Sequence, residues 1–204
     1  MSSPSAERGR ETKRRLVEAT AQLIDEEGWG AVTTRKVAER AGLRPGLVHY
    51  HFGSVNDLLV DAALVAVRQE VLGAMAMMRQ AGDVAEGLGH ILHVVTGYGT
   101  EDATSVLFNE AMLAARHSDR LRSELAGLLA QWRAAVTEWL RTSGGLDDAE
   151  PVATLLSAAL DGLVLHRMID PSMDTAALTG PLRRLVGVED PAGAHGHQRK
   201  PTRE

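Results

Sequence analysis

Residues 33–52 read TTRKVAERAGLRPGLVHYHF, and this stretch predicts two short helices joined by a tight turn. The threonine pair that opens it supplies an N-cap for a first helix over residues 35–41. Gly42 ends that helix where the chain has to reverse, as is common in helix–turn–helix units. Pro45 suits the start of a second helix over residues 45–51, because its missing N–H is not needed there. That second helix needs support from its neighbours, since isolated helices below about 12–15 residues are marginal.

The solvent side of the second helix carries hydrogen-bond donors and no acid. The residues expected there are Arg44, Gly46, His49 and Tyr50. Such donors meet phosphates and base edges in the major groove of DNA. A helical hairpin without any nucleic-acid role has the same pattern, because the helix–turn–helix shape occurs in many contexts. The pattern alone leaves both interpretations open.

The composition is that of a globular, helix-rich protein. Of 204 residues, 44% are hydrophobic and 24% are charged, which excludes disorder over most of the chain. The absence of cysteine excludes disulfide scaffolds, Cys-bearing zinc fingers, thiolate nucleophiles and iron–sulfur sites. Residues 1–15 are polar, and no apolar stretch approaches the roughly 20 residues that cross a bilayer. We therefore expect a cytoplasmic protein without a membrane partner.

Apolar periodicity predicts an all-α fold. A three- and four-residue spacing predicts the first helix over residues 12–27. Ser54 followed by Asp57 resembles a capping box at the start of a long helix over residues 55–80. Further helices are expected over residues 83–98, 102–116, 119–142, 148–169 and 174–187.

The charges are distributed unevenly. Residues 1–60 hold nine Lys and Arg against eight Asp and Glu, a net charge of +1, whereas residues 61–204 hold thirteen against nineteen, a net charge of −6. Residues 8–15 hold five basic residues and one acid, Glu11, so this short run has a net charge of +4. A basic run at one end of an acidic chain is suited to contact a polyanion, and the alternative is a solvated, frayed terminus.

Two parts of the chain resemble the TetR family of transcriptional repressors. Residues Thr33–Ala38, Ala41–Leu43 and Val48–Phe52 look like its DNA-binding domain in order and spacing. Residues 158–163 through 170–171 are similar to the C-terminal domain of a TetR subgroup that includes the choline-responsive BetI repressors.

The resemblance implies a homodimer of about nine helices per chain that binds double-stranded DNA at a palindromic operator. The expected domains are a DNA-binding domain over 10–56 with its motif at 33–52 and a ligand-binding and dimerisation domain over 57–189. Charge and composition predict a flexible basic arm over 1–9 and a disordered tail over 190–204. The DNA-binding positions carried over from the family are Arg35, Arg44, Pro45, Gly46, His49, Tyr50 and His51.

The chain departs from the family pattern at two positions. The family often has Tyr at the position of His49 and Lys at the position of Val55. Without that Lys one phosphate contact is lost, for which the basic run of residues 8–15 offers a substitute.

The segment from 148 to 169 is apolar over more than one face, which predicts burial on several sides. Small residues in it allow another helix to approach closely. Packed with residues 174–187 against the symmetry mates, it predicts an isologous four-helix interface, and a buried intramolecular core is the alternative. The predicted interface residues are Leu155, Ala158, Ala159, Gly162, Leu163, His166, Leu178, Leu182 and Leu185.

Met and aromatic residues in the same domain are candidates for a ligand pocket, because such side chains line apolar cavities and also fill ordinary cores. The candidates are Met75, Met78, His93, Phe108, Met112, Trp132 and Trp139. His90 and His93 lie one turn apart without a third ligand nearby, so neither a metal site nor a cofactor is predicted.

The function that these patterns favour is sequence-specific repression, released by a small, largely apolar effector. An architectural DNA-binding protein without an effector is one alternative. A helical-bundle enzyme is the other, although no G-x-S-x-G, G-x-G-x-x-G or Walker A sequence occurs and the acid–base pair Glu110 and His117 has no nucleophile.

Overall fold

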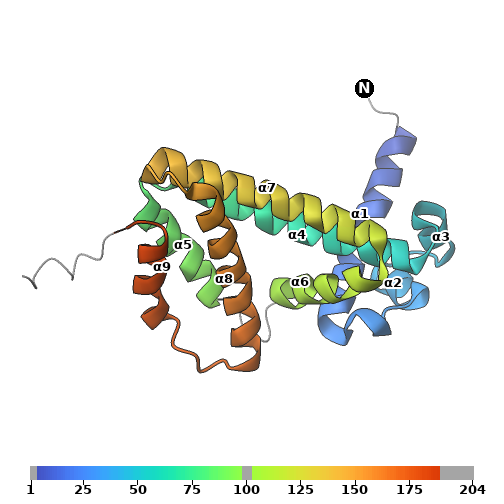
Figure 1. Ribbon diagram of the computed structural model, residues 1–204. Helices are drawn as coiled ribbons and strands as arrows, with labels where there is room; N and C mark the ends of the chain where they lie inside the picture. The colour runs from blue at the N-terminus through green and yellow to red at the C-terminus, as the bar shows by residue number, and fades with distance from the viewer. Residues whose placement is uncertain (1–3, 98–102, 189–204) are drawn as a thin grey trace, which may run out of the picture.

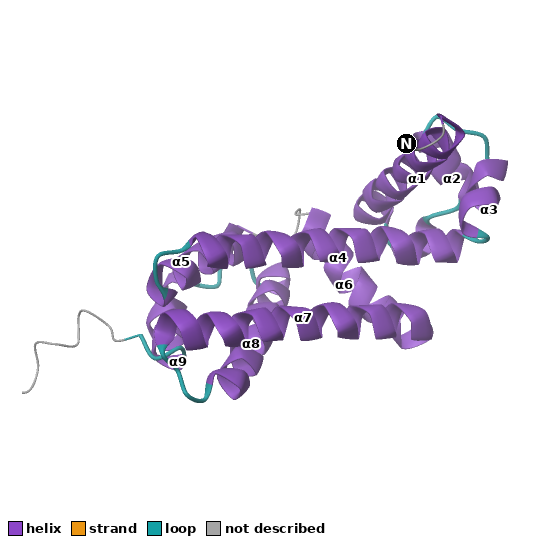
Figure 2. Ribbon diagram, turned by 90° about the horizontal axis from the view of Figure 1, so that it is seen from above, coloured by secondary structure: helices purple, strands orange, loops and turns teal. Residues whose placement is uncertain are grey.

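The computed structural model describes residues 4–97 and 103–188, which form helices and connecting loops without any strand (Figures 1 and 2). The all-α prediction is thus confirmed. The α-helices are α1 (Pro4–Glu27), α2 (Thr34–Arg40), α3 (Gly46–Phe52), α4 (Val55–Gln80), α5 (Val84–Gly97), α6 (Ala103–Ala114), α7 (Asp119–Gly144), α8 (Ala149–Ile169) and α9 (Thr179–Leu185). Three short 3₁₀ turns, η1 (Trp29–Ala31), η2 (Ala115–His117) and η3 (Ala176–Leu178), lie between them.

Local signals in the sequence place the helix boundaries around the N-terminal domain. The hydroxyl of Thr33 accepts a hydrogen bond from the Lys36 N–H at 3.4 Å and caps α2. Gly42 has a φ of +63°, a left-handed conformation that strains any side-chain-bearing residue. The Ser54 hydroxyl accepts from the Asp57 N–H at 3.1 Å and donates to the Asp57 carboxylate at 2.6 Å, so the predicted cap of α4 is present.

Helix α4 connects three hydrophobic cores that follow one another along the molecule. In Figures 1 and 2, α4 and α7 run side by side over most of its length. The N-terminal core consists of Leu16, Ala19, Leu23, Ile24, Val32, Val37, Ala38, Ala41, Val48, Phe52, Leu58, Leu59 and Leu107. The middle core consists of Val60, Ala63, Leu64, Val67, Ala111, Leu121, Leu125 and Leu128. The C-terminal core consists of Met78, Val84, Leu88, Ile91, Leu92, Val95, Val136, Trp139, Leu140, Ala149, Val152, Ala153, Leu156, Leu160, Leu182 and Val186.

Both ends of the described chain differ from the sequence prediction. Helix α1 begins at Pro4 rather than at residue 12, so from residue 4 onward the expected flexible arm is helical. The helix expected over 174–187 is shorter, because Pro181 inside a longer helix would clash with a preceding carbonyl. Helix α9 begins at Thr179, which puts that proline in the first turn, where no N–H is required. The tail expected to be disordered over 190–204 lies outside the described residues.

Helix α8 is long and apolar enough to cross a membrane by length and composition alone, contrary to the sequence prediction. It is one helix, and the core helices of soluble proteins meet the same criterion. Helix α8 packs against α5, α7 and α9, yet 28% of its most apolar window is buried within the chain. Much of its apolar surface is therefore available to another partner.

Candidate nucleic-acid interface and cavity

The predicted DNA-binding residues lie at the surface, around the start of α2 and along α3. Arg35, Arg44, Pro45, Gly46, His49 and Tyr50 are exposed, and His51 is half-buried. Tyr50 has 81% of its surface exposed, which is unusual for an aromatic residue on a packed helix. Its ring meets the His51 ring edge-on at 5.0 Å between centroids. Helix α3 thus presents polar and aromatic side chains outward, as direct contact with DNA requires.

The opposite side of α3 fixes the helix in place. Val48 is completely buried and Phe52 nearly so in the N-terminal core. The ammonium of Lys13 on α1 lies 5.0 Å from the centre of the Phe52 ring and 3.4 Å from the carboxylate of Asp61 on α4. The end of α3 is therefore held between α1 and α4, which supplies the support that a seven-residue helix needs.

The basic residues of the N-terminal domain divide into two groups. Arg40 bonds to the carboxylate of Glu26 at 2.6 Å, and Lys36 pairs with Glu27. The hydrogen bond from Arg40 holds the pKa of Glu26 below its ordinary value. Arg35 and Arg44 have no carboxylate partner in the described residues. Their guanidinium groups stay available for phosphates or base edges.

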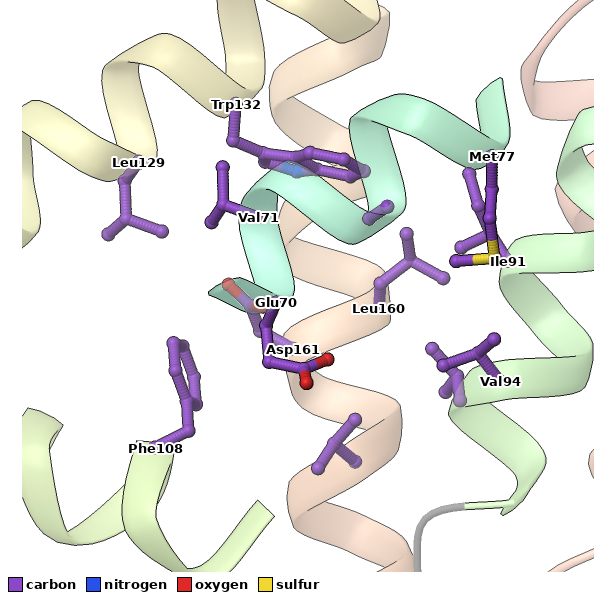
Figure 3. Close-up of a pocket in the computed structure, with 13 residues that line it drawn as sticks. Glu70, Val71, Met77, Ile91, Val94, Phe108, Leu129, Trp132, Leu160 and Asp161 are labelled. Atoms are coloured by element: carbon purple, nitrogen blue, oxygen red, sulfur yellow. The ribbon is translucent and has the colours of Figure 1, made fainter. Parts of the chain in front are cut away.

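A cavity of about 150 Å³ lies among α4, α5, α6, α7 and α8. Figure 3 shows the side chains of Phe108 and Trp132 directed toward it from different helices. The wall is mostly aliphatic and aromatic, with two carboxylates. The lining residues are Glu70, Val71, Ala74, Met77, Ile91, Val94, Val95, Phe108, Leu129, Trp132, Leu160, Asp161 and Val164.

Two of the seven predicted pocket residues, Phe108 and Trp132, line this cavity, and five do not. Met78 is buried in the C-terminal core, and Met75 packs against that core without reaching the cavity wall. The side chains of His93 and Met112 are exposed. Of the three methionines near the end of α4, Met77 lines the cavity. Successive side chains of a helix point about 100° apart, so the neighbouring Met78 points into the C-terminal core instead.

Trp139 is also a core residue, and its neighbour Gly87 explains why. A Cβ atom on Gly87 of α5 would lie well inside van der Waals contact of Trp139 Cζ2. The indole therefore fills the space that the glycine leaves and turns away from the cavity. Its Nε1 is buried without a hydrogen-bond partner in the described residues.

The carboxylates of Glu70 and Asp161 were missed by the sequence prediction. Asp161 is an acid in an otherwise apolar stretch of α8, and this contrast is the signal that could have identified it. Asp161 is exposed at the cavity mouth as a residue, and partial desolvation of its carboxyl by the surrounding protein raises its pKa above the ordinary value. Carboxylates beside the Phe108 and Trp132 rings make a site that favours positive charge on a bound molecule, through Coulomb attraction and cation–π contact.

The predicted interface residues of α8 and α9 are placed unevenly. Leu155, Ala158 and His166 are exposed, whereas Leu182 is buried in the C-terminal core. The remaining five are half-buried: Ala159, Gly162, Leu163, Leu178 and Leu185.

The exposed and half-buried apolar residues of α8 include two that are not among the predicted interface residues, Leu165 and Ile169. Ile169 has 79% of its surface exposed and Leu155 has 58%. Spacings of three and four residues put them on one side of the helix. The residues that form this α8 stripe are Leu155, Ala158, Gly162, Leu165 and Ile169.

Two family descriptions match most of the chain. Residues 16–62 match bacterial regulatory proteins of the tetR family, and residues 79–188 match the tetracyclin repressor-like C-terminal domain. The HTH-type transcriptional regulator BetI of Rhizobium meliloti (strain 1021) is 30% identical over 162 residues, which cover 77% of this chain and 78% of BetI.

Solved structures share the fold. A protein from Streptomyces coelicolor A3(2) is 25% identical with a TM-score of 0.70, covering 86% of this chain and 98% of that one. A transcriptional regulator from Saccharomonospora viridis, solved in complex with choline, is 22% identical with a TM-score of 0.73, covering 87% of this chain and 96% of that one. The family descriptions cover both the N-terminal helices and the helices around the cavity, and this chain therefore belongs to the TetR family of transcriptional regulators.

Proposed function

We propose that the protein is a cytoplasmic repressor that binds a palindromic operator as a homodimer and leaves it when a small molecule fills the cavity. The observation that carries this proposal is the course of α4. Its Leu58 and Leu59 belong to the N-terminal core under α3, and its Glu70 and Met77 line the cavity. A ligand that shifts α4 therefore changes the position of α3 on DNA.

The dimer in this proposal is built on the α8 stripe. Its apolar residues stay open to solvent in the single chain, and Ala158 and Gly162 let a second helix approach closely. A twofold axis beside α8 pairs the stripe with its own copy and gives an isologous interface. Two α3 helices then meet half-sites about one turn of DNA apart, or somewhat more.

The effector that fits the cavity has a largely apolar body and a positive charge. The aliphatic and aromatic wall accommodates the body, and Glu70 and Asp161 balance the charge. The choline complex of the Saccharomonospora viridis regulator supports a small quaternary ammonium as the first molecule to test.

Release follows from linkage. A ligand moves the protein off DNA only if it binds the DNA-incompetent arrangement more tightly. Couplings of about 1–3 kcal/mol, or about 5–150-fold in affinity, are typical of allosteric proteins.

The test begins with selection of a preferred sequence from random duplexes, followed by operator titrations with and without ligand. Choline is compared with 3,3-dimethylbutan-1-ol, a neutral molecule of the same shape. We expect choline to weaken operator binding and its neutral analogue to leave it unchanged. Equal effects of both would reject the cationic effector, and failure to select any sequence would reject DNA-sequence recognition.

An architectural protein without an effector remains a second candidate function, favoured by the small size of the cavity. Thermal-shift screening separates the two, because a ligand that binds only the folded state raises the unfolding temperature. A library of small organic cations that stabilises nothing, on a protein that binds its operator, would favour the architectural candidate.

A further inference from the structure

We infer that the N-terminal turns of α1 form a second DNA-contacting surface, which binds phosphates outside the segment read by α3. This inference rests on the proposed function. Its subject is the α1 overhang, residues Pro4–Thr12, which precedes the first buried residue of the helix, Leu16. At about 1.5 Å per residue, the helix extends about 18 Å from Pro4 to Leu16. Figure 1 shows these turns projecting past the other helices of the N-terminal domain.

The orientation of the overhang is set by Arg15. Its guanidinium donates a hydrogen bond to the carbonyl of Ala41, in the turn that leads to α3. Gly42 leaves room for this contact, because a Cβ atom there would lie 3.2 Å from the Arg15 guanidinium. The face of α1 that carries Arg15 is therefore the face that contacts the turn between α2 and α3.

Arg8 lies on that same face, two turns before Arg15. Seven residues at 100° each return to within about 20° of the starting direction, at a distance of about 10 Å along the axis. Arg8 is exposed and has no carboxylate partner in the described part of the chain. Arg8 thus adds an available guanidinium group to those of Arg35 and Arg44 in the N-terminal domain.

Glu11, an acid of the overhang, lies about 60° from Arg8 around the helix axis and is paired with Arg14. Arg14 bridges Glu11 and Glu18, at 2.6 Å and 2.5 Å respectively, and this pairing neutralises the Arg14 side chain. Arg14 and Arg8 differ by about 120° around the axis. Because Arg14 balances Glu11, the unpaired charge of Arg8 stays complementary to a phosphate backbone, whereas Arg14 itself is paired.

DNA is the partner that binds this surface in our inference. Arginines placed beside α3 reach the backbone on either side of a bound half-site, where contacts fix register without reading bases. Each phosphate neutralised changes the slope of log K against log salt by about 0.9.

The experiment compares Arg8→Ala, which removes an unpaired arginine, with Arg14→Ala, which removes an arginine paired with two acids of the same helix. Operator affinity is measured from 50 to 200 mM salt, on a long duplex and on one trimmed to the selected core. On the long duplex we expect Arg8→Ala to lower the slope by about one unit, so that its deficit against wild type shrinks about threefold across that range. On the trimmed duplex, Arg8→Ala and wild type should bind with the same affinity.

The outcomes separate this inference from the proposed function. Arg44→Ala serves as the reference for α3, and circular dichroism checks that every variant keeps its helices. If Arg8→Ala has the wild-type slope, or the same slope as Arg14→Ala, the overhang is not a DNA-contacting surface even though the operator is bound. If wild type selects no sequence, or Arg44→Ala binds as selectively as wild type, the proposed function itself fails.

Discussion

Leu107 and Phe108 are consecutive residues of α6 that belong to different parts of the molecule. Leu107 is 4% exposed and is a member of the N-terminal core with Leu58 and Leu59 of α4. Phe108 lines the cavity. A change at the cavity wall is thus one residue away from a side chain embedded under the DNA-binding helices. Helix α6 joins α4 as a second physical link between the cavity and α3.

The first prediction concerns the aromatic wall of the cavity. Phe108→Ala and Trp132→Ala should blunt release by a confirmed effector and leave operator affinity without ligand within a few fold. Phe108 packs against the middle core and Trp132 against the C-terminal core, and neither core includes a residue of α3. The measurement is operator affinity with and without ligand. Met112→Ala is the control, since Met112 lies on α6 without lining the cavity. Full release in both variants would place the effector elsewhere, and equal loss of DNA binding without ligand would mark the two rings as structural.

The second prediction concerns the close approach of α5 to α7. Gly87→Ala should destabilise the fold by about 1–3 kcal/mol, because its methyl group has to displace the indole of Trp139 in a packed core. Gly89→Ala meets nothing within 4 Å and should instead stabilise α5 by about 0.5–1 kcal/mol. Urea unfolding followed by circular dichroism measures both. Variants of equal stability would show that the indole moves aside freely.

The third prediction follows from the raised pKa of Asp161. Because the folded state holds the proton more tightly than the unfolded state, stability is greatest below the unfolded value of 3.8 and falls as pH rises through the folded pKa. Asp161→Asn removes this dependence. The variant should therefore gain stability over wild type as pH rises from 4 to 7, and should no longer be stabilised by choline.

Urea unfolding across that pH range provides the measurement for Asp161→Asn. The control is Asp147→Asn, a change of the same chemistry at an exposed loop position. A stability difference from wild type that is constant with pH would contradict the desolvation of Asp161.

The fourth prediction concerns self-association. Ile169→Glu places a charge on the α8 stripe and should convert a dimer into monomers, with a loss of at least tenfold in operator affinity because both half-sites are no longer bound together. Leu72→Glu is the matched control, since Leu72 is 53% exposed on α4 and is not part of the α8 stripe. Analytical ultracentrifugation reports the mass. An Ile169→Glu protein that stays dimeric would exclude the stripe from the interface.

The recognition segment was predictable because its signals are local. Thr33, Gly42 and Ser54 each act on a backbone group within a few residues, and the structure has the two caps and the turn at these positions. The predicted helix over 55–80 matches α4 at both ends for the same reason. The DNA contacts of α3 stay predictions, because they depend on a partner.

The cavity was less predictable, because it depends on how the helices rotate against one another. The sequence alone does not distinguish Met77 from its neighbours Met75 and Met78. Tertiary packing decides that Met77 lines the cavity. Trp132 and Trp139 are seven residues apart on one helix, yet Gly87 opens the core to the second of them. Side chains from separate helices make these choices, and no spacing within one helix encodes them.

The three tryptophans divide the intrinsic fluorescence of the protein by region. Trp29 packs against both the N-terminal and the middle core, Trp132 lines the cavity, and Trp139 is buried in the C-terminal core. A bound molecule therefore quenches or shifts the emission of one indole directly, while a second reports on the junction below the DNA-binding helices. Variants that keep a single tryptophan would therefore show, by fluorescence, whether the cavity or the DNA-binding domain responds first to a ligand.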